Sequence, residues 1–440
     1  MKFDLFFKLA KEAGIEASQL SISRNTSLSF SLFEHEIDSY SANDSYQMSA
    51  IGVYKGKFGS ANTQKSGKAA FEFLVSAIKD NAITSEKKEP AEIFQGSDHY
   101  KPGNYFSSAL AKTPTKDKIA LLRELDTKIE AFDKRIAPNY GVSYEESDTR
   151  SEFYNSYGLK LKERTNCFVI GAQVPVKERE EVREGFDVYF SNDLSTFDCD
   201  AFTKKVCNQG LSKLGSKCIK TGIYPTVLKK DCFSRILSYF LSSVSSEEIQ
   251  RHSSSLEGKL GTRIASPKLT ITENPTLKNV FRSAFDDEGV ATIKKDILKK
   301  GVLKTYLYNI ETARKDGVTT TGNAGYTGSK MGISYGNIVV KSGKKSFEEM
   351  ISPVNEGIFI TSLSGLGTGM NAVSGDFSCQ AEGFHIVDGK IAEPISLITI
   401  SGNLFKLLKT IKDIDNESEL LYGGTTCSNV LIKGMNIGGE

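Results

Sequence analysis

An amphipathic helix after Pro225 constrains the fold of this chain more than any other feature of its sequence. Its apolar residues recur at the three- and four-residue spacing of a helix and are Phe233, Ile236, Leu237, Phe240, Leu241 and Val244. This spacing makes one whole face of the helix apolar, and such a face has to be buried. The chain has 440 residues, which is enough for two or three domains with substantial cores.

Helical spacing of apolar residues predicts three further helices in the first third of the chain. The first covers residues 3–13 and ends before Gly14, the second begins near Ser66, and the third covers about residues 116–132. Between residues 83 and 115 the sequence turns polar and contains Pro90, Pro102 and Pro114. We therefore expect a linker or extended excursion in that stretch.

Strands are expected on both sides of this linker. Leu28, Phe30 and Leu32 alternate with serines, which is the period of a half-buried strand. Residues 140–215 read as strands around the turn at 155–158. Beyond Leu260 the sequence favours short strands and glycine turns, with a hairpin at Asp388-Gly389 because this pair tolerates positive φ.

These elements predict an α+β fold, with helices packed on twisted, mostly antiparallel sheets and a strand-rich C-terminal domain. We expect an N-terminal α+β domain with the linker at 1–105, a central domain at 106–220 and the strand-rich domain at 221–440. No fixed-period repeat and no low-complexity tract interrupts this division.

Charge and hydropathy exclude several classes of protein. The chain has 56 Lys and Arg against 54 Asp and Glu and no basic stripe, so nucleic acid is not the expected partner. It has no apolar run of membrane-spanning length, and Asp4 and Lys8 break any signal-peptide core. The seven cysteines are odd in number and lack Cys-x-x-Cys spacing, so we expect free thiols and a cytoplasmic protein without a membrane partner.

The histidines are few, which limits metal and acid–base chemistry: His35, His99, His252 and His385. His35-Glu36 resembles the start of a zincin motif, but no second histidine follows at helical spacing, so a surface strand is expected. Glu248 and His252 are four apart and could share a helix face, although a solvated helix end fits the surrounding serines better. His385 is expected to be partly buried in a strand, and His99 exposed.

Two further clusters have both a chemical and an ordinary interpretation. The glycines at 365–369 match a dinucleotide fingerprint only in its alanine variant, and no helix is expected after them, so a tight turn is the better interpretation. Asp286, Asp287 and Glu288 precede Gly289; three carboxylates could hold a divalent cation or act as acid and base. Such runs more often form a turn or cap a helix.

A long ordered set of motifs in the C-terminal half resembles the TldD/PmbA family. The matching segments are residues 253–261, 264–267, 285–289, 312–314, 321–324, 369–378, 382–384, 388–390 and 398–404. The turn at 155–158 and the N-terminal strand and helix pattern fit as well, so the resemblance covers nearly the whole chain.

Zinc-carrying members of that family have a His-Glu-x-x-x-His motif on the helix that corresponds to residues 233–244. Aligned on Ile236-Leu237, this chain places Ser238 and Ser243 at the histidine positions and Tyr239 at the glutamate position. Hydroxyls cannot replace imidazoles as zinc ligands, and a tyrosine cannot replace the carboxylate base. The family's cysteine ligand also lacks a convincing counterpart, because Cys427 comes after the expected place.

The resemblance is therefore to the PmbA (TldE) type, and it implies a metal-free subunit of a zinc metallopeptidase complex. Zinc would be carried by a TldD-type partner, and unfolded or flexible peptides would be the substrates. This chain would have no catalytic or metal-binding residue and would hold an extended peptide by strand pairing. The family's older label, modulator of DNA gyrase, finds no support in the charge distribution. Homodimer and heteromer both stay open.

Two alternatives remain beside this interpretation. The chain could hydrolyse peptides alone with unorthodox ligands such as His252, His385 or Asp286, which predicts stoichiometric zinc. It could also be a non-enzymatic binding or scaffold module that never joins a peptidase. For a peptide groove, the candidate residues are polar or glycine-rich positions in the family-matching core: Asp286, Asp287, Glu288, Gly375, Asp376 and Phe377.

Overall fold

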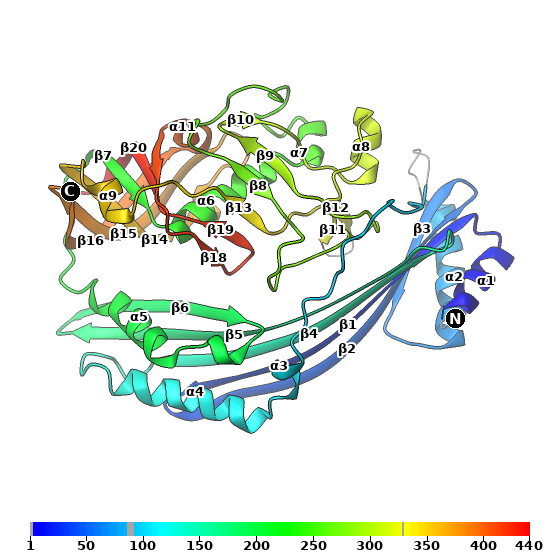
Figure 1. Cartoon of the computed structure of the whole chain (residues 1–440), viewed down its shortest axis with the longest axis horizontal. Coiled ribbons are helices and arrows are strands. Elements are labelled where there is room, and N and C mark those ends of the chain that lie inside the picture. Colours follow the sequence, from blue (N-terminus) through cyan, green and yellow to red (C-terminus); the bar gives the residue numbers. More distant parts are fainter. Residues whose placement is uncertain (1–2, 86–91, 328–329) are drawn as a thin grey trace.

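A long, curved antiparallel sheet carries the first half of the chain, and the second half lies over its concave side (Figure 1). The computed structural model describes residues 3–85, 92–327 and 330–440. Pro90, counted in the predicted linker, lies outside the described residues. The strands of the long sheet are, in spatial order, β3 (Lys57–Thr63), β2 (Glu36–Tyr54), β1 (Ala17–Phe33), β4 (Gly141–Asn155), β5 (Lys160–Glu178) and β6 (Glu181–Ser191).

Helices cover only one face of this sheet. They are α1 (Asp4–Glu12), α2 (Lys68–Thr84), α3 (Ser108–Lys112), α4 (Thr115–Glu130), the 3₁₀ turn η1 (Leu194–Thr196) and α5 (Cys199–Leu211). Leu20 and Ile22 pack against α1 and α2, while Phe30 and Leu32 pack against α4 and α5. Side chains of a strand alternate between its faces, so the intervening serines of β1 point to the opposite, concave face.

Most of the expected elements in this half are confirmed. The three predicted helices are α1, α2 and α4, and the alternating segment at 27–33 lies in β1. The expectation of strands throughout 140–215 is wrong for residues 199–211, which form α5. Asp198 caps that helix by accepting the N–H of Ala201, and Phe202 and Val206 are buried one turn apart, a helical period that the strand interpretation overlooked.

The C-terminal half contains two six-stranded sheets. One has the order β10 (Val302–Leu303), β9 (Lys295–Lys299), β8 (Ile271–Glu273), β13 (Ile338–Val340), β19 (Thr425–Cys427) and β18 (Glu419–Leu421). The other has the order β16 (Lys390–Asn403), β15 (Asp376–Val387), β14 (Glu356–Ser364), β7 (Gly222–Leu228), β20 (Val430–Gly438) and β17 (Ile411–Ile414), and β16 also pairs with β20. A separate hairpin joins β11 (Ala324–Thr327) to β12 (Lys330–Ile333).

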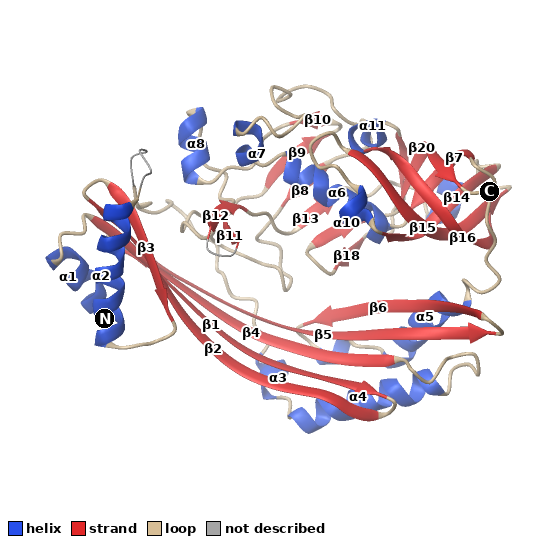
Figure 2. Cartoon of the chain, turned by 180° about the vertical axis from the view of Figure 1, so that it is seen from behind, coloured by secondary structure: helices blue, strands red, loops and turns tan. Residues whose placement is uncertain are grey.

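The amphipathic helix after Pro225 is α6 (Lys230–Ser243), and it lies at the centre of this half. Its face with Phe233, Ile236 and Phe240 is fully buried in a core that includes Ile271 of the first sheet and Ile400 of the second. The other helices are α7 (Ser246–Gln250), α8 (Ile310–Asp316), α9 (Phe347–Ile351), α10 (Leu366–Gly369) and α11 (Leu404–Lys409). The predicted α+β class with a strand-rich C-terminal region is therefore confirmed (Figure 2).

An extended segment at about 92–106, which lies between α2 and α3 in the sequence, is hydrogen-bonded to both halves of the chain. Asn155, in the turn predicted at 155–158, donates its amide N–H to Phe94 O at 2.6 Å. Tyr100 donates its hydroxyl to Gly289 O at 2.7 Å. Because β1 pairs with β4 from Gln19 to Phe33, one sheet runs through the predicted N-terminal and central domains. The proposed division at 105 and 220 stays a prediction.

None of the helices in the described part of the chain combines the length and the apolar character needed to cross a bilayer. All seven cysteines are free, and Cys167 and Cys218 alone among them are not fully buried.

Candidate functional site

The second half of α6 carries Ser238, Tyr239 and Ser243, the three positions predicted to correspond to the zinc motif. Ser243 is buried and donates its hydroxyl to Tyr239 O at 2.9 Å, and Ser238 donates to Arg235 O at 2.8 Å. The hydroxyl of Tyr239 reaches Leu366 O at 3.5 Å. Serines in helices commonly return their hydroxyls to the preceding turn in this way. The hydroxyls at these positions therefore bond to main-chain carbonyls.

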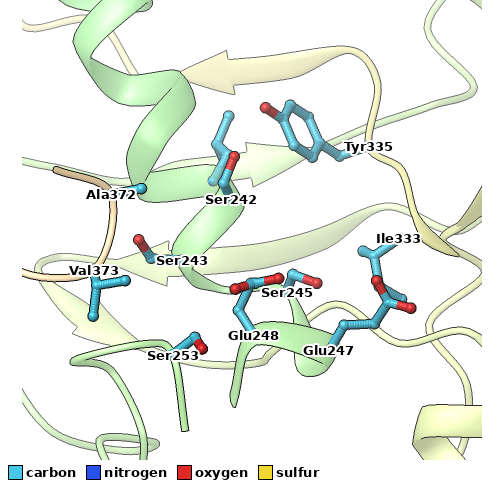
Figure 3. Close-up of a pocket in the computed structure, with 11 residues that line it drawn as sticks. Ser242, Ser243, Ser245, Glu247, Glu248, Ser253, Ile333, Tyr335, Ala372 and Val373 are labelled. Carbon is cyan, nitrogen blue, oxygen red and sulfur yellow. The ribbon is translucent and has the colours of Figure 1, made fainter. Parts of the chain in front are cut away.

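A cavity of about 230 Å³ opens at this end of α6, where three distant segments meet. Figure 3 shows Ala372 and Val373 on one side and Ile333 and Tyr335 on the other, with serines and glutamates of the α6–α7 segment between them. The lining residues of that segment are Leu241, Ser242, Ser243, Ser245, Glu247, Glu248 and Ser253. Among the three predicted zinc-motif positions, Ser243 lines this small cavity, whose walls are both polar and apolar.

The two glutamates supply the charge of the cavity. Arg251, whose side chain is half exposed, lies 3.4 Å from Glu248 Oε1 through Nη1 and 3.8 Å from Glu247 Oε1 through Nη2. The spacing of Glu248 and His252 allows them to share a helix face, but His252 Nδ1 instead lies 3.0 Å from both carboxylate oxygens of Glu257. The expectation of a solvated helix end at His252 is confirmed, because its side chain is exposed.

A tight turn supplies the Ala372 and Val373 wall. Asn371 Oδ1 accepts the N–H groups of Val373 and Ser374 at 3.0 Å, and Gly375 has a φ of +79° that favours glycine. Asp376 is exposed and accepts from Asn403 Nδ2 at 2.9 Å, which holds the pKa of its carboxyl below the usual range. The predicted groove residues Gly375 and Asp376 therefore shape this turn, whereas Phe377 is buried in the core.

The predicted acidic cluster has mainly main-chain partners. Asp286 is 7% exposed and accepts the N–H groups of Glu288, Val290 and Ala324 at 2.9–3.0 Å. Asp287 accepts from Tyr326 N at 2.9 Å, and Glu288 accepts from Ile310 N, at the start of α8, at 2.8 Å. Burial raises the pKa of Asp286 to about 7 and that of Glu288 to about 8. The helix-capping and turn interpretation describes these contacts well.

The two predicted groove segments are not linked by polar contacts in the described part of the chain. Among the residues that the structure describes, no hydrogen bond or ion pair joins the acidic cluster to the turn at 371–376. The cluster instead fixes the main chain of β11, and β11 pairs with β12, whose last residue Ile333 lines the cavity. A role of either segment in peptide binding stays a prediction.

The histidines do not assemble a metal site. His35 lies in the turn between β1 and β2, not in a strand, and its Nδ1 is 2.8 Å from Asp126 Oδ2. His385 lies half-buried in β15, 3.1 Å from Glu393, and His99 is exposed, both as expected. Within residues 3–85, 92–327 and 330–440, no group of three or more His, Cys, Asp or Glu side chains could hold a metal ion.

Sequence reasoning overlooked Ser245, Glu247 and Tyr335 as site residues. No local pattern distinguishes them, because they meet only where α7 and the segment after β12 converge. The sequence also contains no indication of a second cavity, of about 380 Å³. It lies between the edge strands β6 and β18 and has mostly apolar walls, including Val188, Phe190 and Leu420.

Comparisons with known proteins place this geometry in a family. The model of the PmbA/TldA metallopeptidase C-terminal domain matches residues 221–439, and that of the central domain matches residues 109–214. Metalloprotease PmbA of Escherichia coli O157:H7 is 26% identical over 436 residues, which are 97% of this chain and 93% of that protein. The PmbA homologue of Buchnera aphidicola is 32% identical over 308 residues, covering 69% of this chain and 67% of the relative.

Solved structures agree over the full length. A Thermotoga maritima protein described as a modulator of a DNA gyrase has a TM-score of 0.91 at 28% identity, with 99% of both chains covered. TldE from Thermococcus kodakarensis has a TM-score of 0.91 at 19% identity, with 100% of both chains covered. Because its sequence identity is only 19%, the similarity to TldE supports the fold alone.

Proposed function

This chain belongs to the PmbA/TldD metallopeptidase family as a PmbA/TldE-type member, and from that premise we propose that it is the subunit without zinc in a peptidase complex. The zinc would be carried by a TldD-type partner, and the substrates would be unfolded or flexible peptides. The observation that carries the proposal is the absence of any histidine between Thr226 and Arg251.

The residues on α6 do not fit a zinc ion. Zinc sites in proteins use imidazole, thiolate or carboxylate ligands, three of them in a catalytic centre, whereas Ser238 and Ser243 offer neutral hydroxyls that already donate to the main chain. Cys427 is fully buried, burial raises the pKa of its thiol, and the thiol donates to Ser428 O at 3.3 Å. A thiol held neutral is a poor metal ligand.

The contribution of this chain would be to hold the peptide. Extended peptides bind by adding a strand to an exposed sheet edge, which recognises main-chain groups rather than a particular sequence. The edge strands β6 and β18 border the 380 Å³ cavity, and its apolar walls suit side chains of an unfolded segment. This arrangement supports a role in presenting peptides without selecting one sequence.

We further propose a cytoplasmic location, supported by cysteines that are all free. The gyrase label comes from the Thermotoga protein's description. A net charge of +2 on this chain offers no footprint for nucleic acid, so we keep the label as a family name and place DNA outside the proposed function.

The test is the zinc content and casein-type peptidase activity of the purified chain, alone and mixed with a TldD-type protein from the same organism. We expect less than one tenth of a zinc per chain and no activity alone, and activity after mixing. The TldD-type protein alone, and the same protein mixed with the heat-denatured chain, are the controls. About one zinc per chain with activity alone would support the stand-alone peptidase instead. No gain on mixing would support a binding module.

A further inference from the structure

The cavity at the end of α6 has carboxylates without a lining cation. Glu247 and Glu248 are its charged residues, and none of the described residues that line it is a lysine, arginine or histidine. Arg251 reaches both carboxylates from outside, at 3.4 and 3.8 Å, with half of its side chain exposed. Exposed pairs of this kind are weak, so a cation inside the cavity can compete for both carboxylates.

Ser245 is a polar group in this cavity that has no partner of its own. Its residue is 9% exposed, and it lines the cavity beside Glu248 (Figure 3). No hydrogen bond within the described part of the chain uses its hydroxyl. Because Ser245 lines the cavity, its oxygen is free to accept a hydrogen bond from a ligand there.

The remaining walls are apolar, and the volume is small. Leu241, Ile333, Ala372 and Val373 line the cavity together with the polar residues. Pockets for drug-sized ligands measure about 300–1,000 Å³, and this one measures about 230 Å³. Long cationic side chains pack their methylene groups on apolar surface and keep the charged end with polar groups. The cavity therefore suits one such side chain or one chain end.

We infer that this cavity binds a positively charged group of a peptide, an ammonium or guanidinium, at the C-terminal end of α6. Glu247 and Glu248 hold the charge, Ser245 accepts one of its N–H groups, and the apolar wall receives the aliphatic stem. The inference rests on the proposed function in one respect, namely that the ligand carrying the cation is a peptide. The two sources of this chemistry are a lysine or arginine side chain and the peptide's N-terminal amine.

The test measures peptide binding to the full chain without a partner subunit, by fluorescence anisotropy. Three labelled, unstructured peptides have the same sequence except at one position and at the N-terminus. The first is capped at both ends and has a single lysine, and the second is capped and has acetyl-lysine in its place. The third has a free N-terminus and no lysine. We expect the lysine peptide to bind at least about tenfold more tightly than the acetyl-lysine peptide, and less so at high salt. The third peptide distinguishes a side chain from an N-terminal amine.

Variants of the lining residues test whether the peptide binds in this cavity. Glu248→Gln and Glu247→Gln should each reduce the preference for lysine at least about threefold, and Ser245→Ala should weaken binding without changing the melting temperature by more than a few degrees. Glu72→Gln is the matched control, because Glu72 makes a comparable exposed pair with Lys68, at 3.6 Å, on α2. This control should bind like the parent chain.

Equal binding of all three peptides, or no binding of any peptide, would overturn the inference. A full preference for lysine retained by Glu247→Gln and Glu248→Gln together would also overturn it. These outcomes are independent of the proposed partner role, which depends on zinc content and on activity after mixing. The chain can therefore fail one test and pass the other.

Discussion

Glu163 on β5 accepts the backbone N–H of Ala284 at 3.1 Å and thereby ties the long sheet to the C-terminal half of the chain. Its other oxygen lies 3.4 Å from the hydroxyl of Ser283. The side chain belongs to a residue only 9% exposed, and burial raises the pKa of its carboxyl from 4.5 to about 7. We therefore expect the contact between the two halves to depend on pH.

The first prediction concerns this pH dependence. A raised pKa means that the folded state binds the proton more tightly, so the stabilisation from Glu163 is fully present below pH 4.5 and is lost as pH rises through about 7. Glu163→Gln stays neutral and keeps an acceptor for Ala284. Its stability relative to the parent should therefore rise between pH 5 and pH 8 by on the order of 2 kcal/mol, as measured by urea denaturation.

Glu178→Gln, at an exposed end of the same strand, serves as the control and should show no such trend. A stability difference between Glu163→Gln and the parent that is the same at pH 5 and pH 8 would rule out a raised pKa for Glu163.

The second prediction compares two glycines near the 230 Å³ cavity. Gly365 and Gly375 have φ values of +75° and +79°, but only at Gly375 would a Cβ lie 2.7 Å from the Phe405 ring, whereas Gly365 has open space. Gly365→Ala should cost about 1–2 kcal/mol for the backbone conformation. Gly375→Ala should cost about 2–4 kcal/mol because overpacking adds to it. Thermal unfolding measures which variant loses more stability. Equal losses would mean that the turn at Gly375 can shift to accommodate the added Cβ.

The third prediction separates a structural from a binding role of the acidic cluster. Asp286 accepts three main-chain N–H groups and Asp287 accepts one. An amide has a single acceptor oxygen, so at pH 8 Asp286→Asn should lose about 2–3 kcal/mol from unsatisfied donors, and Asp287→Asn less than about 1 kcal/mol. Chemical denaturation measures both.

Peptide cleavage by the mixture with a TldD-type protein provides a second readout for these variants. An Asp286→Asn chain that keeps its stability but supports less cleavage would favour the peptide-groove interpretation over the structural one.

The fourth prediction concerns the buried pair of Glu273 and Lys295, which lie opposite each other on β8 and β9. Their side chains are 1% and 9% exposed, and Nζ lies 2.6 Å from Oε2. Glu273 also accepts from Asn323 and from Gly336 N at 3.0 Å, which fixes the segment that carries Ile333 and Tyr335 to the cavity. Glu273→Gln should cost about 3–5 kcal/mol, because it leaves a buried cation without its partner.

The double variant Glu273→Gln, Lys295→Met should recover part of that loss in a double-mutant cycle, since no charge then remains. Losses that simply add would show that the two side chains act independently.

Periodicity in the sequence was enough to predict several of the elements and their buried faces. The face of Phe233, Ile236 and Phe240 is buried as predicted, and the predicted hairpin at Asp388-Gly389 has both residues at positive φ. These features depend on neighbours a few positions away, so local spacing reveals them. The mistaken strand prediction at 199–211 shows the limit of this reasoning, because a 13-residue helix follows long strands and its period is easily assigned to them.

Tertiary structure alone decided where the candidate sites lie. Ser245, Tyr335 and Val373 lie between 38 and 128 residues apart in the sequence. No local pattern links them, and they meet only after both C-terminal sheets have packed around α6. The sequence by itself determined which chemistry α6 lacks, because the absence of histidine from this helix can be read directly from the sequence. Which carboxylates and hydroxyls converge in its place depends on long-range packing, which sequence spacing does not encode.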